Sequence, residues 1–299
     1  MSASVWLLLL GLLVRASPRA ERTIYWTGFG AATVSGWVLL WVMRSVYGGV
    51  SDVLSFLLHG NDLVRLLDSD FTGNIGDVFA LLLHRDTPLS GEEFGAGSTA
   101  TMNAIACLLQ YVLRDGDAAS MLIGLLSYIG RVATYLGLRP YIHPDVRPRA
   151  QAAFLLIPSV TFWTAGLVKE AVAMIGVGLV IFATGGALTR RWPRILLAVP
   201  GMTIIAITKA YVMLPLGLAL GTFVYMTRGI QRDPSGKIRI RPLVVVMAAA
   251  IAVGGVILLG KLFPEYSAES VGNSLAEQQL HGEEAGGGSY VAVGDSNER

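Results

Sequence analysis

Long apolar runs separated by short basic loops dominate the pattern of this chain. Four runs, residues 24–43, 118–138, 169–187 and 243–259, carry few charges, and each is followed within a few residues by arginine or lysine. A helix needs about 20 apolar residues to cross the hydrocarbon core of a bilayer. The pattern therefore predicts an all-α fold, a polytopic bundle of transmembrane helices.

Shorter apolar runs bring the predicted number of spans to about eight. The chain opens with an apolar run that has no basic residue before it, which favours a first short span over a cleaved signal peptide. Residues 151–163 are expected to run outward and residues 169–187 to return. Residues 195–208 and 211–225 are expected to form a second hairpin with Lys209 at its tip.

The polar segments predict the orientation of the bundle. Basic residues cluster in four short loops, at 15–22, 139–149, 190–194 and 228–241. Basic loops face the cytoplasm, so the acidic stretch at residues 48–97 is expected to lie outside. The membrane domain is predicted to cover residues 1–262, and a polar, glycine-rich tail on the outer side residues 263–299.

Three shorter segments need separate interpretation. Amphipathic pieces within residues 48–97 are too short to cross and are expected at the membrane interface. Residues 99–113 are expected to be re-entrant or interfacial, because an odd number of crossings must separate the acidic loop from the next basic loop. Residues 237–241, KIRIR, alternate like a strand but are predicted to be a solvated loop that sets orientation.

Composition supports the membrane class and excludes several activities. The chain of 299 residues is 53% hydrophobic and 15% charged, whereas about a quarter of the residues of a soluble domain are charged. A net charge of +2 gives no reason to expect nucleic acid. The one cysteine, Cys107, lies in an apolar segment and is expected to be a buried thiol.

No cofactor or metal is predicted, because the chain has no nucleotide-binding or metalloprotease motif. The four histidines stand in no ligand spacing, although a metal held by His59 or His84 with loop aspartates is left open. These histidines are His59, His84, His143 and His281.

One charged residue, Arg131, lies well inside an apolar run. Helical spacing places Tyr128, Arg131 and Tyr135 on one face, with Thr134 nearby. We expect this polar stripe to face protein rather than lipid, and charged residues within a membrane are candidates for function. The alternative is a structural arginine that bridges helices or extends toward the interface.

An adjacent pair, Lys169 and Glu170, interrupts the apolar sequence between residues 151 and 187. Neighbouring residues on a helix project about 100° apart and cannot pair closely, so each is expected to find another partner. The alternative is an ion pair or solvated charges with a structural role only. Trp163 lies seven residues before Glu170 and would share its face on a continuous helix. That continuity conflicts with the predicted hairpin turn, and an interfacial anchor is the other interpretation of Trp163.

The run at residues 157–170, IPSVTFWTAGLVKE, resembles a P-S-x-x-F-W-x-x-x-x-x-K-[DE] signature. This signature is typical of bacterial O-antigen or exopolysaccharide polymerase-like membrane proteins. Two other segments agree with the family in order and spacing, GAGSTATMNAIACLLQ at 95–110 and AGGGSYVAVGD at 285–295. Proteins of this type usually continue into further spans after the second segment, so the resemblance implies a truncated or split chain.

The resemblance implies a multi-pass protein of the bacterial inner membrane that moves a glycan from a polyprenyl diphosphate onto a sugar hydroxyl at the outer face. Such a reaction needs cations for the diphosphate leaving group and a carboxylate to accept the proton of the hydroxyl. The residues implied for these roles are Lys169, Lys209 and Arg131 as cations, Glu170 or Asp52 as the carboxylate, and Trp163 against the sugar.

Two other classes of function remain open. A transporter or flippase for the lipid-linked glycan would use an interrupted helix with charges near its break. A non-catalytic subunit that works with other polysaccharide assembly proteins would agree with the shortened chain.

Overall fold

The computed structural model describes most of the chain, namely residues 19–48, 51–91, 94–232 and 238–240. It divides into two compact units, Met1–Val212 and Met213–Arg299. Almost all of the candidate residues belong to the first unit. The predicted first span, residues 243–259 and the polar tail lie outside the described residues.

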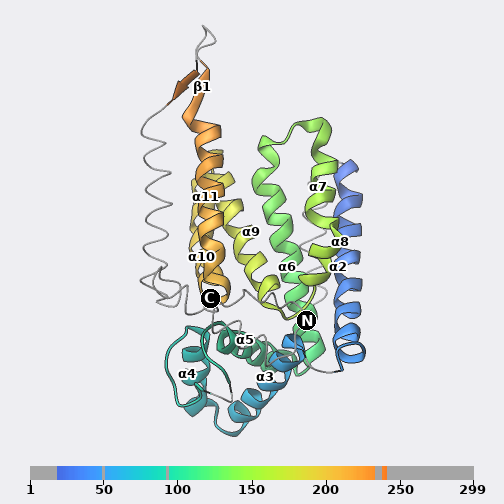
Figure 1. The fold of residues 1–299 in the computed structure, drawn as a ribbon, viewed down its shortest axis with the longest axis vertical. Helices are drawn as coiled ribbons and strands as arrows, with labels where there is room; N and C mark the ends of the chain where they lie inside the picture. Colours follow the sequence, from blue (N-terminus) through green and yellow to red (C-terminus); the bar gives the residue numbers. More distant parts are fainter. Residues whose placement is uncertain (1–18, 49–50, 92–93, 233–237, 241–299) are drawn as a thin grey trace, which may run out of the picture. The chain divides into compact units, whose positions relative to one another are not determined.

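Three long helices form the centre of the first unit: α2 (Arg19–Ser45), α6 (Gly116–Leu138) and α9 (Lys169–Leu188). Within this unit α2 runs antiparallel to α6, whereas α6 and α9 run parallel (Figure 1). Their sequences are apolar over most of their length, and their bounds agree with the predicted runs.

Within the described residues, four helical stretches are long and apolar enough to cross a membrane. These are Glu21–Ser45, Gly116–Tyr141, Lys169–Leu188 and Trp192–Thr227. The chain is therefore a helical membrane protein, and the predicted all-α membrane class is confirmed at this level.

Residues 151–163 do not form one span. They belong to two short helices, α7 (Arg147–Leu156) and α8 (Pro158–Trp163), which both pack along α2. The break falls at Ile157, whose backbone is extended, with φ −61° and ψ 116°. Proline has no N–H to continue the helix and disfavours helical geometry in the residue before it, so Pro158 accounts for the break.

The acidic stretch and the segment that follows it fold into a layer of helices at one end of the first unit (Figure 1). The layer consists of α3 (Asp52–Ser69), α4 (Phe71–Leu82) and α5 (Gly97–Leu113). One face of α3 is buried against α5, with Leu63 and Leu67 in the contact. The predicted amphipathic segments are thus helices, and α5 is too short to be one of the four candidate spans.

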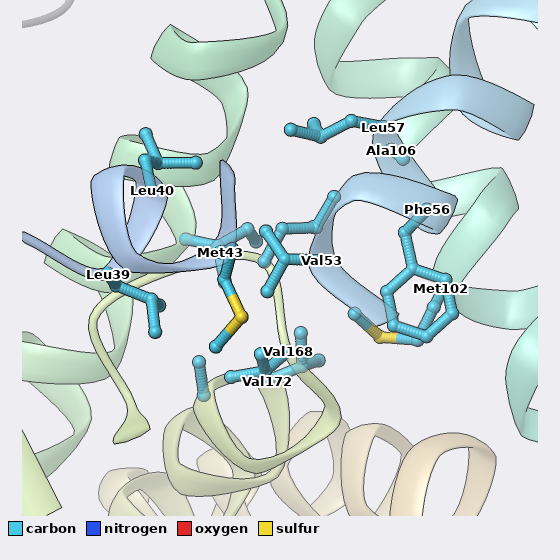
Figure 2. Close-up of a cluster of buried hydrophobic side chains, with 13 residues drawn as sticks. Leu39, Leu40, Met43, Val53, Phe56, Leu57, Met102, Ala106, Val168 and Val172 are labelled. Carbon is cyan, nitrogen blue, oxygen red and sulfur yellow. The ribbon is translucent and has the colours of Figure 1, made fainter. Parts of the chain in front are cut away.

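A hydrophobic cluster joins this layer to the long helices (Figure 2). Met43 of α2, Val53 of α3 and Val172 of α9 meet there, and Phe56 lies against Met102 of α5. These side chains are almost fully buried. Burial of one such side chain contributes about 1.5–3 kcal/mol relative to exposure in water, so the cluster holds the layer against the bundle.

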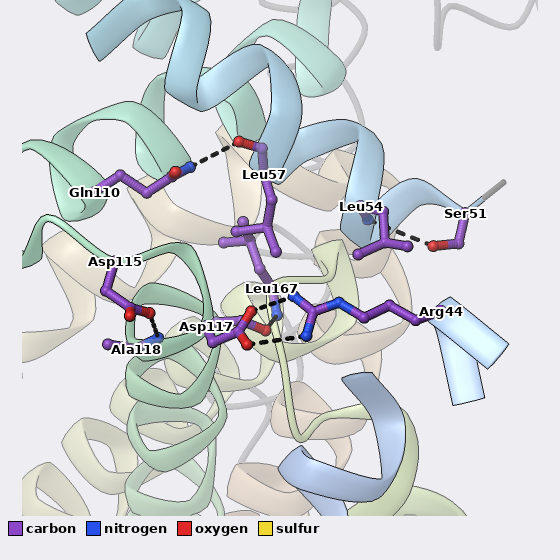
Figure 3. A network of polar contacts seen from close by, with 10 residues as sticks. Arg44, Ser51, Leu54, Leu57, Gln110, Asp115, Asp117, Ala118 and Leu167 are labelled. Carbon is purple, nitrogen blue, oxygen red and sulfur yellow. Dashed lines mark hydrogen bonds and ion pairs between the residues drawn. The ribbon is translucent and has the colours of Figure 1, made fainter. Parts of the chain in front are cut away.

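Polar contacts hold the helices together on each side of this junction (Figure 3). Arg44 Nη1 donates to Asp117 at 3.0 Å, which joins the end of α2 to the start of α6. Gln110 Nε2 donates to the Leu57 carbonyl at 3.0 Å and joins α5 to α3. Such a buried amide without a partner would cost about 1–3 kcal/mol, so this hydrogen bond fixes how α5 lies on α3.

Glycines bring α6 and α9 into backbone contact. A Cβ atom on Gly178 would lie 2.1 Å from the Gly130 carbonyl oxygen, and one on Gly185 would lie 2.1 Å from that of Gly137. The two pairs repeat at the same seven-residue interval in both helices. Small residues let membrane helices approach closely, so these glycines serve the packing of α9 against α6.

After α9 the chain forms a 3-10 turn η3 (Trp192–Leu197), helix α10 (Ala198–Lys209) and a second 3-10 turn η4 (Ala210–Val212). Two further 3-10 turns, η1 (Arg139–Tyr141) and η2 (Pro144–Val146), link α6 to α7. α10 ends at Lys209, the residue predicted for the tip of the second hairpin.

The described part of the second unit begins with α11 (Met213–Val224) and a π-helical turn (Tyr225–Gly229). Two short strands follow, β1 (Ile230–Arg232) and β2 (Ile238–Ile240), which pair antiparallel with Ile230 opposite Ile240. Within the predicted loop, residues 238–240 of the alternating segment thus form a strand, paired with β1.

Candidate functional site

The structure brings four predicted charged residues together where the helical layer meets α9 and α10. Lys169 and Glu170 open α9, Lys209 ends α10, and Asp52 opens α3. The charges of Asp52, Glu170 and Lys209 all act on the Lys169 ammonium group. We call these four residues the charge cluster.

Lys169 and Glu170 bind different partners, as their spacing predicted. Lys169 Nζ donates to Thr99 Oγ1 of α5 at 3.0 Å. Glu170 forms an ion pair with Lys209 Nζ. The two neighbouring charges therefore connect α9 to two different elements, the helical layer and α10.

Lys169 is the cation of the cluster that has no carboxylate partner in the part of the chain that the structure describes. No Asp or Glu carboxylate of the described residues lies within ion-pair distance of Lys169 Nζ. The ammonium group is partly buried and lies 5.9 Å from the centre of the Phe56 ring. An ammonium group has three N–H donors, and the Thr99 hydroxyl takes one of them, so Lys169 can still bind an anionic group.

Lys209 and Glu170 differ in exposure. The Lys209 side chain is 18% exposed and packs 5.6 Å from the centre of the Tyr211 ring, whereas the Glu170 side chain is 50% exposed. The charge cluster thus presents the accessible carboxylate of Glu170, which neutralises Lys209 but does not pair with Lys169. Asp52 is a second exposed carboxylate beside them.

Arg131 does not join the charge cluster. Its side chain is 2% exposed, and its Nη1 donates to the Leu155 carbonyl at 3.2 Å and to Thr161 Oγ1 at 2.7 Å. The break at Ile157 leaves the Leu155 carbonyl without its helical donor, and Arg131 supplies one. Arg131 therefore bridges α6 to α7 and α8, as the alternative interpretation describes.

The face that carries Arg131 is buried, as predicted. Tyr128, Thr134 and Tyr135 are all less than one-tenth exposed. The Tyr128 hydroxyl donates to the Tyr25 carbonyl of α2 at 2.6 Å, so the stripe faces protein.

The predicted shared face of Trp163 and Glu170 is wrong. α8 ends at Trp163 and α9 begins at Lys169, with a turn at residues 164–168 between them. The predicted turn is therefore present, although the segment before it is two short helices and not the one span that was predicted. Trp163 is 49% exposed and packs edge-on against Phe162, so it stands apart from Glu170 on a different helix.

Two site residues were missed in the sequence. Thr99 binds Lys169 from a position 70 residues earlier, and Phe56 lies below the same ammonium group. Thr99 lies in the small-residue segment 95–110 of the family resemblance, and that was the only signal that pointed to it.

Histidines and the cysteine take other positions. In the described ranges no group of three metal-binding side chains lies close enough to hold a metal ion. His59 stacks edge-on against Phe94, and His84 Nε2 lies 2.9 Å from the Ile207 carbonyl oxygen. Cys107 is buried as predicted, and burial raises the pKa of its thiol to about 12.

The chain was compared with protein-family models, with curated proteins and with solved structures, and none of these comparisons gives a match. Function is therefore inferred from the charge cluster together with the run at residues 157–170.

Proposed function

We propose that this protein is a multi-pass enzyme of the bacterial inner membrane that transfers or polymerises sugars carried on polyprenyl diphosphate, at the outer face. The observation that carries the proposal is Lys169, a partly buried cation with no carboxylate partner among the described residues, beside the Glu170–Lys209 pair. A diphosphate at the end of a lipid needs fixed cations where apolar helices meet a polar layer, and the cluster lies at such a junction.

The reaction assigns one role to each member of the cluster. The oxygen of an acceptor hydroxyl attacks the anomeric carbon, the bond from that carbon to the diphosphate oxygen breaks, and the polyprenyl diphosphate leaves with the bonding electrons. Lys169, together with Lys209, stabilises the charge that grows on the leaving group. Glu170 or Asp52 accepts the proton of the hydroxyl, and both are accessible.

The distribution of charge supports the outer location. Arginines gather at the end of the bundle where α6 and α9 finish, whereas the acidic layer and the charge cluster lie where α9 begins. Loops rich in arginine stay in the cytoplasm, so the cluster belongs to the opposite face.

A transporter for the same lipid-linked glycan is the second candidate. The break between α7 and α8 favours it, because transporters bind substrates at discontinuous helices, and Arg131 lies buried at this break.

The test uses the full chain in liposomes with a polyprenyl-diphosphate-linked oligosaccharide, and product length and glycan movement between leaflets are both measured. We expect wild type to form longer glycans, Lys169→Ala and Glu170→Ala to lower the rate at least a hundredfold, and Lys169→Arg to keep part of it. Arg65→Ala, an exposed change in α3, is the control.

Equal rates in wild type and both alanine variants would remove the active-site assignment. Movement of the glycan without any product would favour the transporter. A deletion strain that carries the same variants, with their abundance in the membrane checked, gives the corresponding surface polysaccharide chain lengths.

A further inference from the structure

The end of the first unit away from the charge cluster gathers arginines from distant parts of the sequence. Glu21 of α2 binds Arg139 after α6, and Gln151 of α7 donates to the Glu21 carbonyl at 3.1 Å. The contact between Gly137 and Gly185 places the end of α9 beside the end of α6. The arginines at these ends are Arg19, Arg22, Arg139, Arg147, Arg149, Arg190, Arg191 and Arg194.

Few acidic groups neutralise this end. Among the described residues the acidic groups there are Glu21, which is bound to Arg139, and Asp145, which lies 3.3 Å from His143. The turn after α9 exposes Arg190 and Arg191, and neither forms an ion pair within the described residues. A positive surface therefore remains at the ends of α6 and α9.

Apolar side chains stand directly beside the same arginines. In η3, Trp192 is 62% exposed and Leu196 is 71% exposed. Arg194 packs along α9, with its guanidinium carbon 4.5 Å from the centre of the Phe182 ring. An exposed indole and an exposed aliphatic chain next to three arginines match the boundary between lipid headgroups and acyl chains.

We propose that the segment from Arg190 to Leu196 binds the phosphodiester groups of anionic phospholipids, with Arg190, Arg191 and Arg194 on the phosphates and Trp192 and Leu196 on the glycerol and acyl chains. A soluble polyanion would use the arginines but gain nothing from the exposed apolar side chains, which is why a lipid is the favoured partner. This site is independent of glycan transfer, so its failure would leave the proposed enzyme untouched.

The test measures binding of cardiolipin and of phosphatidylcholine to the purified full chain by native mass spectrometry. In Arg190→Gln/Arg191→Gln we expect cardiolipin to bind roughly thirtyfold more weakly, since each arginine near an anionic lipid surface contributes about 1 kcal/mol. The matched control, Arg65→Gln/Arg85→Gln, removes two exposed arginines from the helical layer and should change the affinity less than about twofold.

Trp192→Ala should weaken cardiolipin binding without a change of charge, which a site for soluble polyanions would not show. Unchanged thermal unfolding of each variant establishes that the fold is kept. The proposal would be overturned if the two double variants lost cardiolipin affinity equally, or if neither lost any. It would also be overturned if heparin displaced cardiolipin and Trp192→Ala bound cardiolipin as tightly as wild type.

Discussion

Lys209 forms its ion pair with Glu170, 39 residues earlier, and so links the last turn of α10 to the first turn of α9. The pair holds Glu170 against α10, whereas Lys169 contacts Thr99 of α5 instead. Because the Glu170 side chain is half exposed, solvent screens the attraction.

We predict a small coupling energy for this pair. A double-mutant cycle with Glu170→Gln and Lys209→Gln should give about 0.5–1 kcal/mol, because the charges attract in a partly aqueous environment. Thermal or denaturant unfolding in detergent measures it, and the value should fall as salt is added. A coupling of zero at low salt would show that the pair does not form.

Close packing of α6 on α9 should make Gly178 intolerant of a side chain. Gly178→Ala places a methyl group against the Gly130 carbonyl, and we expect a loss of about 1–3 kcal/mol in the free energy of unfolding. Gly30→Ala in α2 is the matched control, since a Cβ atom there meets nothing within 4 Å. If both variants unfold at the wild-type midpoint, the two backbones are farther apart than described.

The contact between Arg131 and Thr161 should stabilise the broken helix. Thr161→Val keeps the shape of the side chain but removes an acceptor from a buried guanidinium, so we expect a loss of about 1.5–3 kcal/mol. Thr164→Val, at a buried residue just after α8 whose hydroxyl donates to the Val160 carbonyl four residues earlier, should cost less than about 1 kcal/mol. The unfolding curves of the two variants, measured side by side, test whether Arg131 bridges the helices. Equal losses in the free energy of unfolding would contradict the bridge.

Cys107 should be inert in the folded protein. Its thiol has a pKa of about 12, well above the ordinary value, so at pH 8 roughly one molecule in ten thousand carries the reactive thiolate. Maleimide labelling should therefore fail at pH 8 in mild detergent and succeed after denaturation in SDS. Val112→Cys, on the exposed face of the same helix, should label rapidly, and equal labelling of Cys107 would show that the layer is open.

Hydrophobic length and helical periodicity determined the membrane class and the bounds of the long helices from sequence alone. Both are local properties, because a helix satisfies its own backbone hydrogen bonds and needs only apolar side chains to enter a bilayer. The same periodicity placed Tyr128, Arg131 and Tyr135 on one buried face. The spacing of Lys169 and Glu170 showed that they do not pair with each other.

Only the tertiary structure decided which partners these charges take. Thr99 and Lys209 reach α9 from α5 and α10, and contacts between such distant segments leave no periodic trace in the sequence. The turn at residues 164–168 separated Trp163 from Glu170, since its geometry depends on packing against α2 and α6. The sequence therefore identified the charged candidates. The packing of whole helices determined that four of them form the charge cluster at one end, whereas Arg131 is buried as a bridge between helices.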